Sequence, residues 1–337
     1  MAQNTLLARL KGKLIVGIAI GGLVYLLVVV YSGWTELSAA LASFPWLLFP
    51  LLLLLAFANY VFRFFKWDFY LRTLAIDLPK KDSFIIFLSG LIMTISPGKI
   101  GELLKTVLLK QANRTPISVS APIVVAERLT DFVALVVISL AGLALFTVET
   151  ASVLVLVAVV VVLALFVGLV SNRRASLWMI GLIEHRRMFA KVGHRLHDAY
   201  ESIYRLVRPG PLTVATIWST LAWFCECLGF WITISAFTDD PNLMAASFIY
   251  ALGTIVGVVS PGGLGVTEGS MLGMLQTKAL MGAARLGKAD AGAATLIIRI
   301  ATLWFAVFVG AVVLILFQGR FGDAAEELDA ELAKQDN

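Results

Sequence analysis

Two apolar segments of this sequence are interrupted by the same Ser-Pro-Gly motif. The first reads Ser96-Pro97-Gly98-Lys99-Ile100-Gly101-Glu102, and the second reads Ser260-Pro261-Gly262-Gly263-Leu264-Gly265-Val266-Thr267-Glu268. Proline removes a backbone donor and glycine permits tight turns, so each motif is predicted to end a helix. The half-helix that follows presents free N–H groups and the positive end of its dipole, which bind anions such as phosphate. The repeated motif therefore indicates an anion-binding cavity.

Cationic side chains near the two motifs would strengthen such a site. Lys99 lies within the first motif, and Arg128 and Arg299 lie in the apolar stretches that follow the motifs. An arginine fork suits phosphate oxygens because it donates two parallel hydrogen bonds. The candidate substrate-binding residues are Ser96, Pro97, Gly98, Lys99, Gly101, Glu102, Arg128, Ser260, Pro261, Gly262, Gly263, Gly265, Glu268 and Arg299.

Five carboxyl groups in the apolar part are candidates for proton coupling or ion pairing: Glu102, Glu127, Asp131, Glu226 and Glu268. Simpler roles are open to several of them. Glu102 and Glu268 could cap the half-helices, and Asp131 could pair with an arginine three residues before it. Glu226 could carry a proton or be a structural partner of one of the two arginines. A charge near the bilayer centre costs about 2.5–3.5 kcal/mol, which favours a polar interior and a functional role.

Two further basic residues, Arg63 and Lys66, lie at the inner end of the second predicted span. Long basic side chains near a helix end can keep their stems in the apolar region and reach the headgroups. Either this pair extends to the headgroups or it belongs to the same polar interior as the other intramembrane charges.

The composition is that of a membrane protein. Hydrophobic residues make up 59% of the chain and charged residues only 15%, with a mean hydropathy of +0.90, which no soluble surface of this size permits. Segments such as Leu14–Tyr31 and Thr150–Val170 are long and apolar enough to cross a bilayer. The first of them is predicted to be a retained anchor.

Neither a metal nor a cofactor is predicted. Cys225 and Cys227 lie two residues apart on a predicted helix and point in different directions, and the three histidines fall in one polar segment without further ligands. The basic residues behind the net charge of +5 lie in loops, where they set orientation, so no nucleic acid partner is expected.

The distribution of basic residues predicts the topology. The N-terminal segment is basic and the loop 32–43 is not, so the N-terminus is predicted to be cytoplasmic. Both flanks of the segment 83–111 are basic, which predicts a re-entrant hairpin that enters from the inside, whereas the segment 243–280 is predicted to enter from the outside. The two halves would then form an inverted-topology repeat.

The predicted fold is an all-α polytopic membrane protein with about six spanning helices and two re-entrant hairpins. Its units are an N-terminal anchor helix (1–43), a first repeat (44–148) with hairpin 83–111, a span plus a basic amphipathic helix on the cytoplasmic surface (149–211), a second repeat (212–317) with hairpin 243–280, and an acidic cytoplasmic tail (318–337). The apolar stripe of the basic helix is expected to lie on the membrane surface.

The paired motifs, together with Glu127-Arg128 and Asp131, resemble those of the flippase-like transmembrane region of lysylphosphatidylglycerol synthases, a family that also occurs as stand-alone membrane proteins. The resemblance covers about residues 10–318. It implies handling or transbilayer movement of a lipid with an anionic headgroup in the bacterial cytoplasmic membrane. It does not imply aminoacyl transfer, because only the acidic tail follows the last span. Related proteins are associated with glycolipid, polyprenyl-linked and hopanoid pathways.

The leading hypothesis is therefore a lipid transporter, not an enzyme, that moves an anionic phospholipid or a polyprenyl-linked lipid or glycolipid by alternating access. One alternative is an intramembrane lipid-modifying transferase, for which the apolar part offers no obvious metal cluster or acidic pair. Another is a scaffold without transport that recruits enzymes of lipid or hopanoid synthesis through the basic helix. Candidate partners are membrane lipids with anionic headgroups, a second copy of the chain and lipid-synthesis enzymes.

Overall fold

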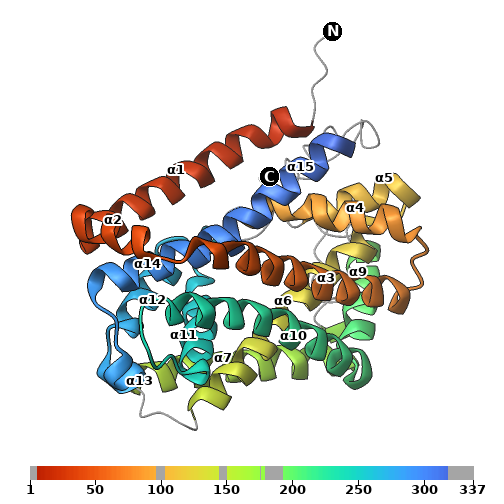
Figure 1. Ribbon diagram of the computed structural model, residues 1–337. Helices are drawn as coiled ribbons and strands as arrows, with labels where there is room; N and C mark the ends of the chain where they lie inside the picture. Colours follow the sequence, from red (N-terminus) through yellow and green to blue (C-terminus); the bar gives the residue numbers. More distant parts are fainter. Residues whose placement is uncertain (1–5, 96–102, 144–149, 175, 179–192, 318–337) are drawn as a thin grey trace.

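A computed structural model of the chain describes residues 6–95, 103–143, 150–174, 176–178 and 193–317. These residues form helices and turns without any strand, which confirms the predicted all-α membrane fold (Figure 1). Among them, five helical stretches are long and apolar enough to cross a membrane: Leu14–Ser32, Trp46–Thr73, Val153–Ser171, Pro209–Ser235 and Lys288–Phe317. The sixth predicted span corresponds to α6, a helix of 27 residues whose middle carries three charged side chains.

The first half comprises the helices before and after the first break. They are α1 (Leu6–Ser32), α2 (Trp34–Ser43), the short turn η1 (Trp46–Leu48), α3 (Phe49–Thr73), α4 (Lys80–Gly90), the 3-10 turn η2 (Leu91–Ile95), α5 (Leu104–Asn113), α6 (Ile117–Leu143) and α7 (Thr150–Ser171). The helices α4 and α5 pack against one another on either side of the break. This pairing agrees with a hairpin at 83–111; that it re-enters the membrane from one side remains a prediction.

The second half also contains a break between two packed helices. Its elements are α9 (Gly193–Leu206), α10 (Pro209–Ser235), α11 (Leu243–Gly257), the turn η4 (Pro261–Gly263), α12 (Val266–Leu275), α13 (Lys278–Met281), η5 (Gly282–Ala284), α14 (Lys288–Arg299), the π-helical turn η6 (Ile300–Trp304) and α15 (Phe305–Phe317). The helices α11 and α12 pack together across the second break.

Local chemistry explains where several helices begin. The helices α3 and α10 have a proline within their first turn, where the missing N–H would have no helical partner. Asn242 caps α11, since its side-chain oxygen accepts hydrogen bonds from the N–H groups of Met244 and Ala245 at 2.8 and 3.1 Å. The continuous stretch α14–η6–α15 contains a π-helical turn directly after Arg299, a feature that often accompanies functional sites.

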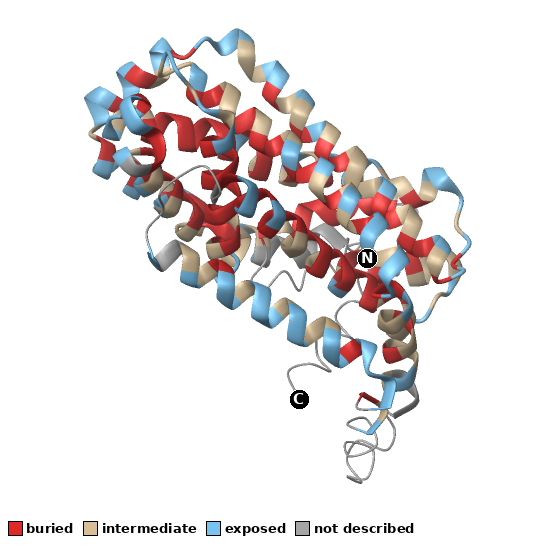
Figure 2. Ribbon diagram, turned by 90° about the horizontal axis from the view of Figure 1, so that it is seen from below, coloured by how far each residue is buried: buried red, intermediate tan, exposed pale blue. Residues whose placement is uncertain are grey.

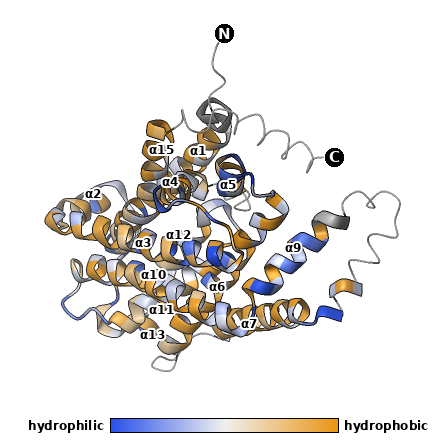
Figure 3. Ribbon diagram, turned by 90° about the vertical axis from the view of Figure 1, so that its right-hand side faces the viewer, coloured by the Kyte–Doolittle hydropathy of each residue, from blue (hydrophilic) through white to orange (hydrophobic). Residues whose placement is uncertain are grey.

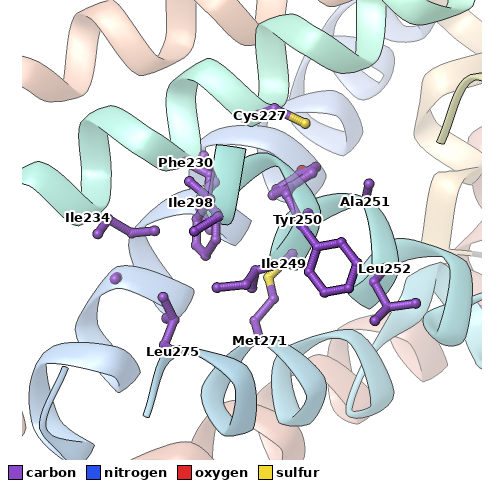
Figure 4. Packing of buried hydrophobic residues seen from close by; sticks show 14 of the residues in the cluster. Cys227, Phe230, Ile234, Ile249, Tyr250, Ala251, Leu252, Met271, Leu275 and Ile298 are labelled. Atoms are coloured by element: carbon purple, nitrogen blue, oxygen red, sulfur yellow. The ribbon is translucent and has the colours of Figure 1, made fainter. Parts of the chain in front are cut away.

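The core lies where helices from both halves meet. The helix α3 runs along α10, and α6 packs against both α10 and α11. Apolar side chains of α10, α11, α12 and α14 interlock there, including Phe230, Tyr250, Met271 and Ile298 (Figure 4). Buried positions gather in this central region, and exposed positions dominate the outer helices (Figure 2). Val30 of α1 and Leu165 of α7 are 71% and 68% exposed, as expected for side chains that face lipid.

The helix α9 belongs to the predicted basic amphipathic segment, and it is largely hydrophilic beside the apolar α7 (Figure 3). It packs against α6, α7 and α10, with Tyr200, Leu206 and the following Val207 buried. An apolar stripe on an otherwise polar helix can be covered by protein or by lipid, so the position of the segment on the membrane surface stays a prediction. Burial raises the pKa of the Tyr200 hydroxyl above its usual value.

Candidate functional site

The second Ser-Pro-Gly motif interrupts the helical path as the sequence predicts. The helix α11 ends at Gly257, Ser260 is extended, and α12 begins at Val266. Gly262 and Gly265 have positive φ angles of 61° and 85°, a region that other residues enter only at an energetic cost. The glycines are therefore required by the path of the backbone at this break.

Glu268 and Arg299 join this break to α14. The Oε2 atom of Glu268 accepts a hydrogen bond from the Gly265 N–H at 2.7 Å, and its Oε1 atom accepts one from Arg299 Nε at 2.6 Å. Arg299 Nη2 in turn donates to the carbonyl oxygen of Gly262 at 2.7 Å. Both charged side chains are buried. Glu268 thus caps the half-helix and binds the arginine, which combines the two roles considered for it.

The first motif can be placed only through its neighbours. Its six candidate residues, Ser96, Pro97, Gly98, Lys99, Gly101 and Glu102, lie outside the described residues. The turn η2, which directly precedes them, packs against η4 of the second break. A Cβ atom added to Gly262 would lie 3.2 Å from the Cα of Ile95 and 3.4 Å from the carbonyl oxygen of Thr94. The segment leading into the first break therefore touches the second break.

A cavity of about 80 Å³, here called the central cavity, lies at this contact. Three arginines from three different helices line it: Arg63 of α3, Arg128 of α6 and Arg299 of α14. Thr94 of η2 and the glycines Gly262 and Gly263 of η4 complete the wall between the halves. Two of the three predicted cationic residues thus reach one cavity, and Arg63, for which a polar interior was one of two possibilities, lines it as a third.

Arg63 and Arg128 also belong to a group of polar side chains that we call the Asp131 cluster. Its other members are the buried residues Lys66, Asp131 and Ser219. Asp131 is 2.7 Å from Lys66 Nζ, 3.3 Å from Arg128 Nη1 and 3.6 Å from Arg63 Nη2. The Ser219 hydroxyl accepts from Lys66 at 2.8 Å and donates to Asp131 at 3.1 Å. The predicted pair of Arg128 and Asp131 is present.

Of the two possibilities for Lys66, the polar interior is the one observed, because its side chain is fully buried. The carboxylate of Asp131, on α6, holds the ammonium group inside the bundle. Spacing along the sequence does not reveal this partner, because the two residues lie on different helices.

A comparison with known families identifies the family of this chain. A family model described as the lysylphosphatidylglycerol synthase transmembrane region matches residues 14–310, which include both breaks and the Asp131 cluster. The chain belongs to this family. A "UPF0104 membrane protein" of Methanothermobacter thermautotrophicus is 23% identical over 324 residues, which cover 89% of this chain and 94% of that protein. A second match, to a protein of the same name and organism, is 32% identical over 114 residues, or 33% of this chain and 32% of that protein.

The family assignment confirms the resemblance and indicates a lipid-related membrane function for the chain. It covers every charged side chain of the central cavity. Among the residues that the structure describes, no group of three or more His, Cys, Asp and Glu side chains is placed to hold a metal ion.

Two more residues of this family member were missed at the sequence level. Lys105 of α5 is buried and lies 2.5 Å from Glu127, with its ammonium group 4.8 Å from the centre of the Trp67 ring. The sequence offered one signal, a lysine in the half-helix after the break. Trp223 of α10 lines the central cavity, and its Nε1–H is buried without a hydrogen-bond partner in the described part of the chain. Only the structure reveals this donor.

Glu226 is the carboxyl group that lines the central cavity. It accepts a hydrogen bond from the Tyr250 hydroxyl at 2.6 Å, and that hydroxyl also lies 3.5 Å from Thr302 Oγ1. Glu127, Asp131 and Glu268 each contact a cation instead. The ion pair considered for Glu226 with Arg128 or Arg299 is replaced by a bond to a neutral tyrosine.

Proposed function

We propose that this protein moves a lipid with an anionic headgroup across the cytoplasmic membrane, and that the headgroup binds in the central cavity. The observation that carries the proposal is the convergence of Arg63, Arg128 and Arg299 on one small cavity within the bundle. Charged side chains inside a membrane protein generally face a substrate pathway or a polar interior, and guanidinium groups suit phosphate oxygens.

The unpartnered Nε1–H of Trp223 supports the same proposal. A buried donor without an acceptor costs about 1–3 kcal/mol, and a headgroup oxygen in the cavity would satisfy it. The donor adds an uncharged contact to the three charged ones. An anion with several oxygens could accept from both kinds of donor at once.

The contact between the breaks supports transport rather than simple binding. Alternating access requires that the halves rock against each other around a shared site, and η2 and η4 come from different halves and meet at the cavity. In this mechanism Glu226 is the candidate for proton coupling, because it lies on the cavity wall beside a neutral donor. A reaction on the lipid is not part of the proposal.

Reconstituted proteoliposomes test the proposal. The assay measures translocation of a fluorescently labelled phosphatidylglycerol and, for comparison, of an uncharged glycosyl diacylglycerol with the same label. The protein should accelerate movement of the first lipid only, and Arg299→Gln should abolish the acceleration. Arg72→Gln is the matched control, because this arginine pairs with Asp68 on an exposed face of α3. No acceleration by the folded wild-type protein for any anionic lipid would rule out the proposal.

A further inference from the structure

A lateral groove opens beside the second break, between α1 and α12. Its volume is about 340 Å³. The α1 side is apolar and includes Val24, Leu27 and Val28, and the α12 side includes Gly269 and Gly273. A Cβ atom added to either glycine would have no neighbour within 4 Å, so the groove is open above both positions. The helix α1 lies at the edge of the bundle, where lipid has access (Figure 1).

The lining of this groove includes one charged side chain, Glu268, which is fully buried. Its partner Arg299 lines the central cavity on the other side, together with Gly263 and Thr267. An ion pair 2.6 Å long therefore links a residue of the groove lining to a residue of the cavity lining.

The helix α1 is fastened beside this ion pair. Trp304 Nε1, one turn beyond Arg299, donates a hydrogen bond to the Tyr25 hydroxyl of α1 at 2.5 Å. Val24 packs with Leu264 and Ile95, which come from the two segments that meet at the breaks. The wall of the groove is thus attached to residues that directly follow lining residues of the central cavity in the sequence.

We propose that the groove between α1 and α12 holds the acyl chains of the lipid whose headgroup occupies the central cavity, and that the Glu268–Arg299 pair is the partition that the headgroup passes. The inference rests on the proposed function. The central cavity of about 80 Å³ takes a phosphate-sized group but not acyl chains, which need an apolar neighbour. The groove supplies that neighbour. The Glu268–Arg299 pair links its lining to that of the cavity, and an anionic headgroup can compete for the charge of Arg299.

A larger apolar groove of about 790 Å³ lies between α6, α7 and α9. It is lined by residues such as Ile117, Phe166 and Ile203, and neither groove shares a lining residue with the central cavity. The Glu268–Arg299 pair joins the lining of the smaller groove to that of the cavity, and neither of its residues lines the larger groove. The smaller groove is therefore the one that fits a lipid held by its headgroup.

Filling the groove tests the inference. Gly269→Leu and Gly273→Leu place side chains in the groove, and Gly168→Leu on the exposed face of α7 is the matched control because its Cβ also meets nothing within 4 Å. In the proteoliposome assay, each groove variant should slow phosphatidylglycerol translocation by about tenfold, equivalent to ~1.4 kcal/mol, and the control should leave it unchanged. Thermal unfolding in detergent should be the same for all three variants. Wild-type rates in both groove variants would overturn the inference.

A phosphatidylglycerol with a photoreactive group at the end of one acyl chain gives a readout that does not need transport. Illumination of the wild-type protein in nanodiscs should label peptides of α1 and α12, and Gly269→Leu should remove this labelling. If the wild-type protein fails to translocate lipid, the proposed function falls, and the labelling alone decides whether the groove holds the chains. Equal labelling by an uncharged lipid with the same chains would overturn the inference, because the groove would then take any membrane lipid.

Discussion

The two halves of the molecule hold their buried charges in different ways. In the first half, Asp131 meets cations of α3 and α6 and a serine of α10, so the cluster ties three long helices together. In the second half, Glu268 and Arg299 form one pair that is bonded to the backbone of the break itself. The buried charges described in the two halves thus stand in different settings. We infer that the first half is the rigid side of the cavity and the second half is the side that responds to a ligand.

Removing the Asp131 carboxylate, on the side that we infer to be rigid, should lower the stability of the protein the most. Asp131→Asn leaves the buried Lys66 without its counter-charge, and breaking a buried pair in this way costs about 3–5 kcal/mol. We expect a lower thermal unfolding temperature in detergent and loss of translocation. Asp68→Asn is the control, since it breaks a pair with the exposed Arg72 worth less than about 1 kcal/mol. Equal effects of the two substitutions would contradict a structural role for the cluster.

Removing the carboxylate of the responsive side should cost less stability but as much activity. Glu268→Gln keeps an oxygen that can accept from the Gly265 N–H, so part of the cap survives while Arg299 loses its counter-charge. We expect a stability loss of about 2–3 kcal/mol, smaller than that of Asp131→Asn, and at least a tenfold slower translocation. The comparison of the halves fails if this variant is the less stable of the two.

The contact between the breaks predicts smaller changes in stability, which should be of opposite sign at Gly262 and Gly269. Gly262→Ala places a Cβ 3.2 Å from the Ile95 Cα at a φ of 61°, and should destabilise the protein by about 1–2 kcal/mol. Gly269→Ala, whose Cβ meets nothing within 4 Å in a helix, should stabilise it by about 0.5–1 kcal/mol. Thermal unfolding of both variants checks this difference. Two shifts of the same sign would mean that the breaks do not constrain each other.

The smallest effect on stability is expected at the cavity wall. Trp223→Phe keeps an aromatic ring but removes the buried donor, so the free energy of unfolding should change by less than about 1 kcal/mol. Translocation of phosphatidylglycerol should nevertheless fall several-fold, because the headgroup loses a hydrogen bond. Unchanged transport by this variant would remove Trp223 from the site and leave recognition to the arginines.

The sequence was sufficient for the class of fold, the second break and the pairing of Arg128 with Asp131, because each depends on local composition or on spacing within one helix. It could not reveal Lys66 or Lys105 as buried partners, since their carboxylates come from α6. It could not reveal the packing of α9 on the bundle either, because an apolar stripe does not say whether lipid or protein covers it. Trp223 carried no signal at all, as an indole in an apolar helix is ordinary.

Binding of an anionic headgroup in the central cavity is the claim on which the rest depends, and ligand-induced stabilisation measures it most directly. The purified protein in neutral nanodiscs would be titrated with a short-chain phosphatidylglycerol and, separately, with an uncharged diacylglycerol of the same chain length, while thermal unfolding is followed. Our account predicts that only the phosphate-bearing lipid raises the unfolding temperature, and that Arg299→Gln removes this rise. Equal stabilisation by both lipids, or a rise that survives the loss of Arg299, would contradict it.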